Sequence, residues 1–351
     1  MKRVFINLKL KMVVLALMIV SGIRAQTHEV SKTVIKKFYK VPENGKLKIS
    51  ADFARIHIHT GSGDSLGIKI TVRVKSDKRS TADQYLNGIT YSVKQSGNTF
   101  YIENYQSGSA SNYFYNIGVF KNRYVEYESV YEITMPASFD LHIDADYSVL
   151  KINDLYGKLY ADMDYGRILA GNLQNSGNRI EGDYMTRNRI EMLRGGEINS
   201  DFSDFDIDLS FYLKIQSDYS KFHLNHAKTV VFEGDFSHLD AERIKSLYVD
   251  SDYARFRVKR LYKLKMQGDF NHLTVERLPS TAQYYDLKGE YGEYVIRNPD
   301  RVSFVYHLTG DYSQAQIMDQ SITGERTGYY LNNDAKIRFR FDIDFGKLII
   351  K

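Results

Sequence analysis

A short phrase recurs every 17 residues between Leu213 and Leu278. It reads LKIQSDYSKFHL from Leu213 and LYVDSDYARFRV from Leu247, and it is anchored by an aspartate followed by Tyr or Phe. The four anchor aspartates are Asp218, Asp235, Asp252 and Asp269. A short repeat that contains apolar alternation is typical of solenoids, in which each coil packs only on its neighbours. The sequence therefore predicts a stack of similar coils.

The columns of this repeat predict which residues face the core. Apolar or small residues alternate with polar ones from Leu264 to Phe270, as in a strand that is buried on one face. Each apolar column keeps one chemical type over four copies, including the column of the aromatic residue that follows each anchor aspartate. We therefore expect every column, that aromatic one included, to face inward, with Phe222, Phe256 and Leu273 in the core.

The fold class that follows is all-β: a single-chain parallel β-helix, or β-solenoid, with about 17–21 residues per coil. We expect two short strands and two turns in each coil, coils stacked ~4.8 Å apart, and one continuous solenoid over residues 141–320. Residues 336–350 should form closing strands at the end of a repeat region that spans 141–351. Because the corners alternate Ser-Asp-Tyr with Gly-Asp-Phe, a coil of double length is an open alternative.

The corner carboxylates extend along the whole repeat region. An aspartate at a tight turn accepts backbone N–H bonds, so we expect a structural role for these residues. Stacked carboxylates could instead bind calcium or form a glycosidase pair, although a catalytic pair would be local rather than present in every coil. The predicted corner positions are Asp146, Asp164, Asp183, Asp201, Asp218, Asp235, Asp252, Asp269, Glu290 and Asp311.

Residues 26–140 differ in pattern from the repeats. They contain several predicted strands and one helix candidate, Arg79 to Leu86, in which Ser80 and Thr81 could cap the first turn. An Asp–aromatic corner already occurs at Asp52–Phe53. We expect a mostly antiparallel β-rich cap that protects the first solenoid edge from pairing with other chains.

Residues 1–25 have the features of a signal peptide. Basic residues precede a short apolar run, Met12 to Val20, and Ala25 is a plausible cleavage residue; an uncleaved anchor is the alternative. We expect an exported protein of the periplasm, cell surface or extracellular space, with no membrane span in the mature chain. Of the 48 basic residues five lie in this segment, so 43 remain against 43 acidic ones. This even balance argues against nucleic acid as a partner.

No local group of residues predicts catalysis. The chain has no cysteine, which excludes disulfides, thiol catalysis and thiolate metal sites. The acidic group Asp201, Asp204, Asp206 and Asp208 fits a solvated strand face, and His238 and His272 recur two coils apart, which is too far for one metal ion. We therefore predict no catalytic residue, no cofactor site and no metal site.

The order of these segments resembles a known family. An N-terminal region of alternating strands, the stretch YEITMP at Tyr131 to Pro136 and the following coils with Ser or Gly turns are similar to the bacterial putative adhesin family, including the group called auto-transporter adhesin head GIN domain. The resemblance covers roughly residues 45–320. It implies an exported β-helical protein without assigned activity, and this chain departs from the family by its Asp-Tyr and Asp-Phe corners.

These observations favour a non-enzymatic exported surface protein, an adhesin or structural binding module that uses an extended solenoid face. Its partner would be a glycan or a cell-surface protein. A polysaccharide-active β-helix enzyme and a cell-envelope sensor or assembly partner remain the alternatives. Tyr-rich surfaces suit glycan contact, but Tyr columns in a solenoid more often stack on one another.

Overall fold

A computed structural model of the chain describes residues 27–106, 125–311 and 314–351. The chain divides into unit 1, residues 1–34, 71–90 and 105–128, and unit 2, residues 35–70, 91–104 and 129–351. The helix of unit 1 is α2 (Arg79–Gly88). The strands are β1 (His28–Lys40), β2 (Lys46–Ser50), β3 (Ala54–Gly61), β4 (Ser65–Ser76), β5 (Ile89–Ser96), β6 (Thr99–Gln106), β7 (Val125–Pro136), β8 (Asp140–Asp144), β9 (Val149–Ile152), β10 (Leu159–Asp162), β11 (Arg167–Leu173), β12 (Asn178–Glu181), β13 (Asn188–Asn199), β14 (Asp204–Gln216), β15 (Lys221–Glu233), β16 (His238–Asp250), β17 (Arg255–Gln267), β18 (His272–Val275), β19 (Tyr284–Glu290), β20 (Glu293–Ile296), β21 (Phe304–Thr309), β22 (Gln314–Ile317), β23 (Gln320–Ile322), β24 (Arg326–Tyr330), β25 (Ile337–Asp344) and β26 (Lys347–Ile350).

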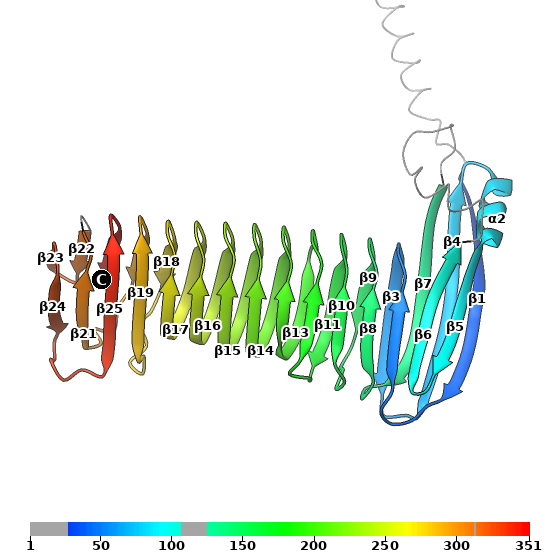
Figure 1. Cartoon of the computed structure of the whole chain (residues 1–351), viewed down its shortest axis with the longest axis horizontal. Helices are drawn as coiled ribbons and strands as arrows, with labels where there is room; N and C mark the ends of the chain where they lie inside the picture. The colour runs from blue at the N-terminus through cyan, green and yellow to red at the C-terminus, as the bar shows by residue number, and fades with distance from the viewer. Residues whose placement is uncertain (1–26, 107–124, 312–313) are drawn as a thin grey trace, which may run out of the picture. The chain divides into compact units, whose positions relative to one another are not determined.

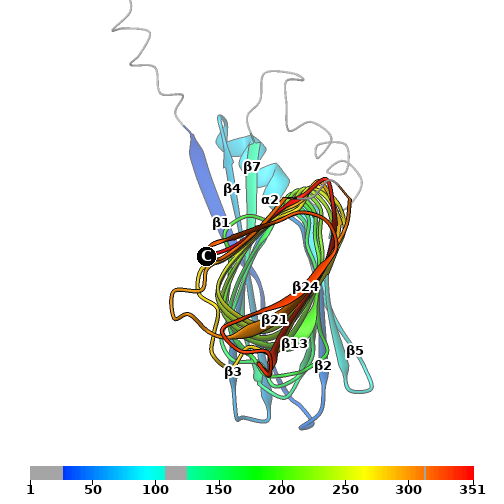
Figure 2. The ribbon, with the colours of Figure 1, turned by 90° about the vertical axis from the view of Figure 1, so that its left-hand side faces the viewer.

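Unit 2 contains the predicted parallel β-solenoid, so the predicted fold class is confirmed. Strands β8 to β20 follow one another side by side in Figure 1, and their coils enclose one core in the end view of Figure 2. In the regular part, each residue pairs with the residue 17 positions later: Phe205 with Phe222, and Leu239 with Phe256. A repeat of 17 in the register rules out the coil of double length in this part.

The regular coils are simpler than expected. Between successive corners, β14, β15, β16 and β17 are each one strand of 13 residues, not two short strands separated by a second turn. Each strand bends around the core and keeps the same parallel register to the next coil on both sides of the bend. A coil therefore has one tight corner and one gently curved edge midway between corners.

The core consists of the predicted apolar columns. Phe222, Phe256 and Leu273 are each 1% exposed, which confirms their predicted place in the core. Phe232 contacts Phe222 and Phe256 edge to face, with ring centroids 6.0 and 5.3 Å apart. Phe and Leu alternate in the column of Phe222, Leu239, Phe256 and Leu273, so larger and smaller side chains interlock between neighbouring coils.

One predicted inward column points outward. Tyr219, Phe236, Tyr253 and Phe270 are 38–52% exposed. Each adopts a left-handed backbone, with φ of 53–55°. A left-handed residue breaks the two-residue alternation, so the side chain leaves the core and the following residue, such as Ser220, takes the buried place. The expectation that the aromatic residue after each aspartate faces inward is therefore wrong.

The last coils do not stack in chain order. Strand β25 lies between β19 and β21 and pairs in parallel with both, through Tyr284 with Arg338 and Phe304 with Ile337. Strand β26 likewise pairs with β20 and β22. The expectations of a continuous stack over residues 141–320 and of closing strands at 336–350 are therefore wrong. The repeat defines what a coil contains, but a coil with matching columns can stack at any level.

Antiparallel strands cover the final coil: β24 pairs with β21, and β23 with β22. At the other end, β2 and β3 pair in parallel with β8 and β9, and also with β6 and β7. Coil-type pairing thus begins well before residue 141 and includes the corner at Asp52–Phe53. The predicted boundary at residue 140 therefore does not mark the start of the parallel pairing.

The predicted helix is present as α2, but its predicted cap is not. The helix is preceded by Lys78, which makes no side-chain capping bond, and Ser80 and Thr81 lie inside the helix. Arg79 instead lies 3.8 Å from the carboxylate of Asp83 one turn later. The helix therefore begins at Arg79, one residue before Ser80 and two before Thr81.

Replacing Phe256 with Asp should lower the free energy of unfolding by ~3 kcal/mol or more, because an unpaired charge would occupy a fully buried site. Phe256→Leu is the matched control, since Leu occupies the same column at Leu239 and Leu273. We expect it to lose only ~1 kcal/mol. Urea denaturation followed by circular dichroism measures both, and equal stability of the Asp variant and the native protein would contradict this core.

Candidate functional site

The corner aspartates bind the backbone of the next coil. The carboxylate of Asp146 accepts the N–H of Asp164, and the same bond recurs from corner to corner up to Asp269 and Glu290, with distances of 2.6–3.0 Å. Asp52 accepts from Asp146 in the same way. Eight of the ten predicted positions therefore accept a backbone N–H from the next coil. The other two, Glu290 and Asp311, donate their own N–H to Asp269 and Asp344.

The aromatic residue after each corner aspartate completes the corner. Its N–H donates to the carbonyl of the corner acid in the next coil, at 2.8–3.1 Å, as Tyr219 does to Asp235. The left-handed backbone of these residues, with φ of 51–56°, is costly for a side chain that carries a Cβ. Two hydrogen bonds per corner and the ring contacts described next offset that cost.

The rings form one continuous stack, which we call the aromatic ladder. Neighbouring rings are parallel within 12°, and their centroids lie 4.6–5.2 Å apart. Each inner ring has a neighbour on both faces, so only ring edges and tyrosine hydroxyls meet solvent. The ladder consists of Phe53, Tyr147, Tyr165, Tyr184, Phe202, Tyr219, Phe236, Tyr253, Phe270, Tyr291 and Phe345.

The alternation of apolar and polar residues assigns this aromatic column to the core, so it does not predict the ladder. The signal that could have revealed it is the acid before each ring, an aspartate everywhere except Glu290, since Asp next to a left-handed residue is turn chemistry. The geometry agrees with the expectation that tyrosine columns stack on one another. A ligand that stacks on ring faces, such as a sugar, finds those faces already covered along the ladder.

Small polar residues fill the inside of the corner. Ser220 accepts the N–H of Ser203 at 2.9 Å, and Ser237 accepts that of Ser220 at 3.1 Å. Asn271 continues this row and accepts the N–H of Ala254 at 3.0 Å. The corner backbone is therefore satisfied from both sides, as a buried turn requires.

The charged groups singled out in the sequence do not form a metal site. Asp204 accepts the N–H of Arg187, and Asp208 lies 3.6 Å from Arg189. His238 contacts Asp240 at 2.9 Å, and His272 lies 3.5 Å from Glu293, so each histidine has its own acidic neighbour. Within residues 27–106, 125–311 and 314–351, no group of three or more His, Asp or Glu could hold a metal ion.

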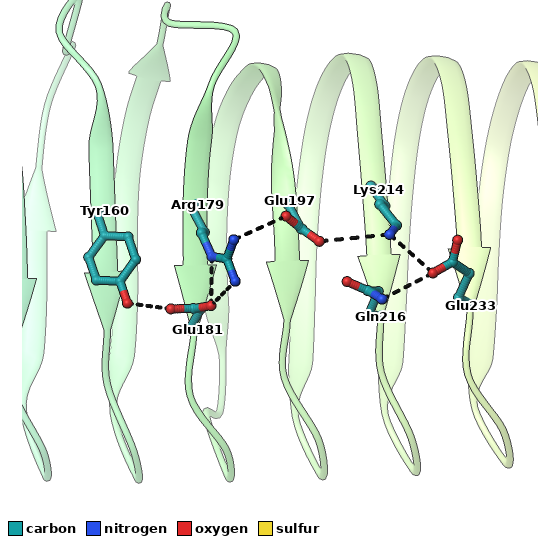
Figure 3. Close-up of polar contacts among 7 residues, drawn as sticks. All are labelled: Tyr160, Arg179, Glu181, Glu197, Lys214, Gln216 and Glu233. Carbon is teal, nitrogen blue, oxygen red and sulfur yellow. Dashed lines mark hydrogen bonds and ion pairs between the residues drawn. The ribbon is translucent and has the colours of Figure 1, made fainter.

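The strand face before the corners carries a chain of alternating charges (Figure 3). Arg179 binds Glu181 and lies 3.6 Å from Glu197, which is 3.9 Å from Lys214. Lys214 in turn lies 3.1 Å from Glu233. The hydroxyl of Tyr160 donates to Glu181, and this bond, together with Arg179, lowers the pKa of that carboxyl. Opposite charges therefore neutralise one another from coil to coil on this face.

Closer to the corners, Asp162 lies among other acids, and its pKa shifts in the opposite direction. Burial, followed by the neighbouring charges of Glu181, Asp144 and Asp164, raises the pKa of Asp162. The carboxylates here repel one another, yet the described residues hold no metal cluster at this place.

A shallow hollow lies on the strand face after the corners, close to β3. It has a volume of about 340 Å³ and is lined by His57, His59, Lys151 and Arg189, among others. A second hollow of about 660 Å³ shares Asn153 and Asp154 with it. Burial, followed by the charge of Lys151, lowers the pKa of His57.

The polar groups between the two hollows are engaged in the fold. Asp154 accepts from both the backbone and the side-chain amide of Asn172, at 3.0 and 2.8 Å. Asn153 accepts the N–H of Thr60 at 3.0 Å. Where the two hollows meet, the carboxylate of Asp154 is therefore held by the fold.

No family model matches the chain, and no curated protein matches it. Solved structures align over most of its length. A putative cell adhesion protein from Clostridium sporogenes is 11% identical, covers 93% of this chain and 99% of its own, and has a TM-score of 0.17. The corresponding values are 10%, 94%, 100% and 0.25 for a putative adhesin from Bacteroides fragilis, and 8%, 92%, 96% and 0.29 for a putative lipid binding protein from Parabacteroides distasonis. At such TM-scores these likenesses carry no argument, and membership of the GIN-domain group stays a prediction.

In the part of the chain that the structure describes, no helix is long and apolar enough to cross a membrane. The predicted signal peptide, residues 1–25, lies outside the described residues.

Substitutions at Asp235 test the structural role that we propose for the corner acids. Asp235→Asn keeps the oxygen that accepts the N–H of Asp252, so we expect nearly native stability. Asp235→Ala leaves that donor without its partner and should cost ~1 kcal/mol in the free energy of unfolding. Thermal melts with and without calcium measure both effects. A calcium-induced rise in melting temperature that Asp235→Asn abolishes would instead support cation binding.

Proposed function

We propose that this protein is an exported, non-enzymatic surface module that binds its partner along an extended face of the solenoid. The observation that carries the proposal is the unbroken register of outward side chains. Lys221, His238, Arg255 and His272 occupy one outward column on four successive coils, and parallel columns run beside it. A rigid surface that repeats its contacts every ~4.8 Å suits many weak contacts with a long partner.

Export rests on the sequence. The basic start of the chain, its short apolar run and Ala25 support a cleaved signal peptide, and the lack of cysteine suits an exported chain that has a large core instead of disulfides. The core of unit 2 runs through every coil from β8 to β20, which supports independence from such cross-links. Periplasm, cell surface and extracellular space are all compatible with these features.

The absence of enzymatic activity is part of the proposal. In a polysaccharide-active enzyme, two carboxyl groups must face each other across a sugar with room to react. Along the corners from Asp146 to Asp269 the carboxylates accept backbone N–H groups, and Asp154 in the hollows is held by Asn172. These commitments support binding rather than hydrolysis.

Coil deletions test the extended face. Removing residues 183–200 deletes one coil and joins Gly182 to Asp201, and removing 235–268 deletes two coils and joins Gly234 to Asp269. Both junctions recreate a Gly-Asp-Phe corner, so we expect both variants to fold, as circular dichroism would verify. Binding of the mature chain to whole cells should fall in steps, more for two coils than for one.

Complete loss of whole-cell binding on removal of 183–200 alone, with the fold intact, would indicate one discrete site and contradict the proposal. The same purified proteins should release no reducing ends from a panel of polysaccharides. Turnover that a single Asp substitution abolishes would favour the alternative of a β-helix enzyme.

A further inference from the structure

The curved edge midway between corners carries a row of cations. Residues 226, 243 and 260 occupy one column on three successive coils, where they are His226, Arg243 and Arg260. Further cations lie within three positions of this column on the same edge. We call the following set the basic edge: His226, Lys228, Arg243, Lys245, Arg260 and Lys263. Four of the six are exposed, and Arg260 and Lys263 are partly so.

The described members of this set form no close ion pairs. Two glutamates of neighbouring columns pair with other cations: Glu242 lies 2.8 Å from Lys259, and Glu276 lies 2.6 Å from Arg257. Within the described ranges of the chain, no member of the basic edge forms an ion pair with an acidic side chain. Glu242 does feel the charge of Arg260, which helps to lower the pKa of that carboxyl, but its close ion pair is with Lys259. The edge therefore carries more positive charge than its acidic neighbours pair directly.

The charge pattern of the basic edge differs from that of another face of the solenoid. On that face charges alternate between coils, from Arg179 to Glu197, Lys214 and Glu233. On the basic edge Arg243 and Arg260 are directly paired neighbours, and like charges opposite each other destabilise a sheet. An arrangement that disfavours folding indicates an anionic partner outside the chain.

Two exposed aromatic residues mark one end of this edge. Phe211 and Tyr212 are 46% and 48% exposed. Tyr212 has Gly195 as its neighbour in one adjacent coil and Thr229 in the other, so no large side chain occupies its column on either side. In contrast to the rings of the aromatic ladder, this ring can offer a face to a ligand. A sugar ring stacks its C–H groups on such a face.

We propose that the basic edge, together with Phe211 and Tyr212, binds a linear acidic polysaccharide. Its carboxylate or sulfate groups would contact the cations of successive coils, and one of its sugar rings would stack on Tyr212. The inference rests on the proposed function and names a ligand class for one stretch of the solenoid. A chain-like ligand suits this edge because cations recur at the same position on successive coils. Arginine also suits carboxylate and sulfate groups, to which it can donate two hydrogen bonds.

Isothermal titration of the mature chain tests the proposal with polygalacturonate, which carries carboxylates, and heparin, which also carries sulfates. Neutral dextran should not bind. Added salt should weaken binding, because exposed charges are screened. The double variant Arg243→Gln, Arg260→Gln should lose about tenfold in affinity for the acidic polymer that binds more tightly.

The matched control is Lys265→Gln, Lys288→Gln, which removes the same charge from exposed positions of β17 and β19 outside the basic edge. We expect its affinity to stay within about twofold of the native value. Equal losses in the two double variants would overturn the proposal, because they would indicate attraction by net charge alone. Circular dichroism must show native folding of both variants.

Polyglutamate and vesicles of phosphatidylglycerol separate the sources of anionic groups. Tyr212→Ser should weaken the binding of polygalacturonate while leaving that of polyglutamate, which has no sugar, unchanged. An equal effect on both polymers, or tighter binding to the vesicles than to either polysaccharide, would overturn the assignment to an acidic polysaccharide. If no polyanion binds but whole cells are still bound, this inference fails and the proposed function stands; if neither binds, both fail.

Discussion

In the described part of the chain, the coils reverse direction at acid–aromatic corners whose backbone would be strained and unsatisfied in isolation. The aromatic residue has a left-handed backbone, and its N–H and that of the preceding acid both need an acceptor. The next coil supplies the carbonyl that accepts the aromatic N–H, and the preceding coil supplies the carboxylate that accepts the N–H of the acid. The rings stack at about 4.9 Å, as for Tyr219 on Phe236. Because each corner completes the one beside it, the corner geometry sets the spacing of the coils. Core columns such as Phe222 on Leu239 then follow in register.

The same dependence explains why chain order can be broken. A coil can stack between two other coils when its corner residues and its core columns match theirs. The coil of β25 and β26 has Asp344 and Phe345 at its corner, and Phe345 stacks beside Tyr291 at 5.2 Å. It can therefore lie between coils that precede it in sequence. The outward faces are less constrained by folding, so they can differ: one face forms ion pairs from coil to coil, whereas the described cations of the basic edge form none.

Much of this architecture could be predicted from the repeat. The period of 17, the parallel stacking and the core positions of Phe222, Phe256 and Leu273 follow from columns of constant chemistry. The outward turn of Tyr253 could not be read from alternation, because a left-handed backbone reverses the face without changing the residue pattern. The place of β25 in the stack could not be predicted either, because coils with the same residue pattern can stack in more than one order. Among the predicted site residues, the corner acids lie along one edge, whereas the unpaired cations of the basic edge emerge only when ion pairs are known.

The central claim is that corner and column geometry, rather than chain order, determines which coils are neighbours. Cysteine pairs test it directly, because the chain has no cysteine of its own. Tyr284→Cys with Arg338→Cys places the two thiols on paired residues of neighbouring coils, within the reach of a disulfide. Tyr284→Cys with Val305→Cys spans two coil spacings, ~9.6 Å, which is too far for that bond. Mild oxidation followed by mass spectrometry of peptides should therefore find the 284–338 link and no 284–305 link; the opposite result would show that the coils stack in chain order and contradict the account.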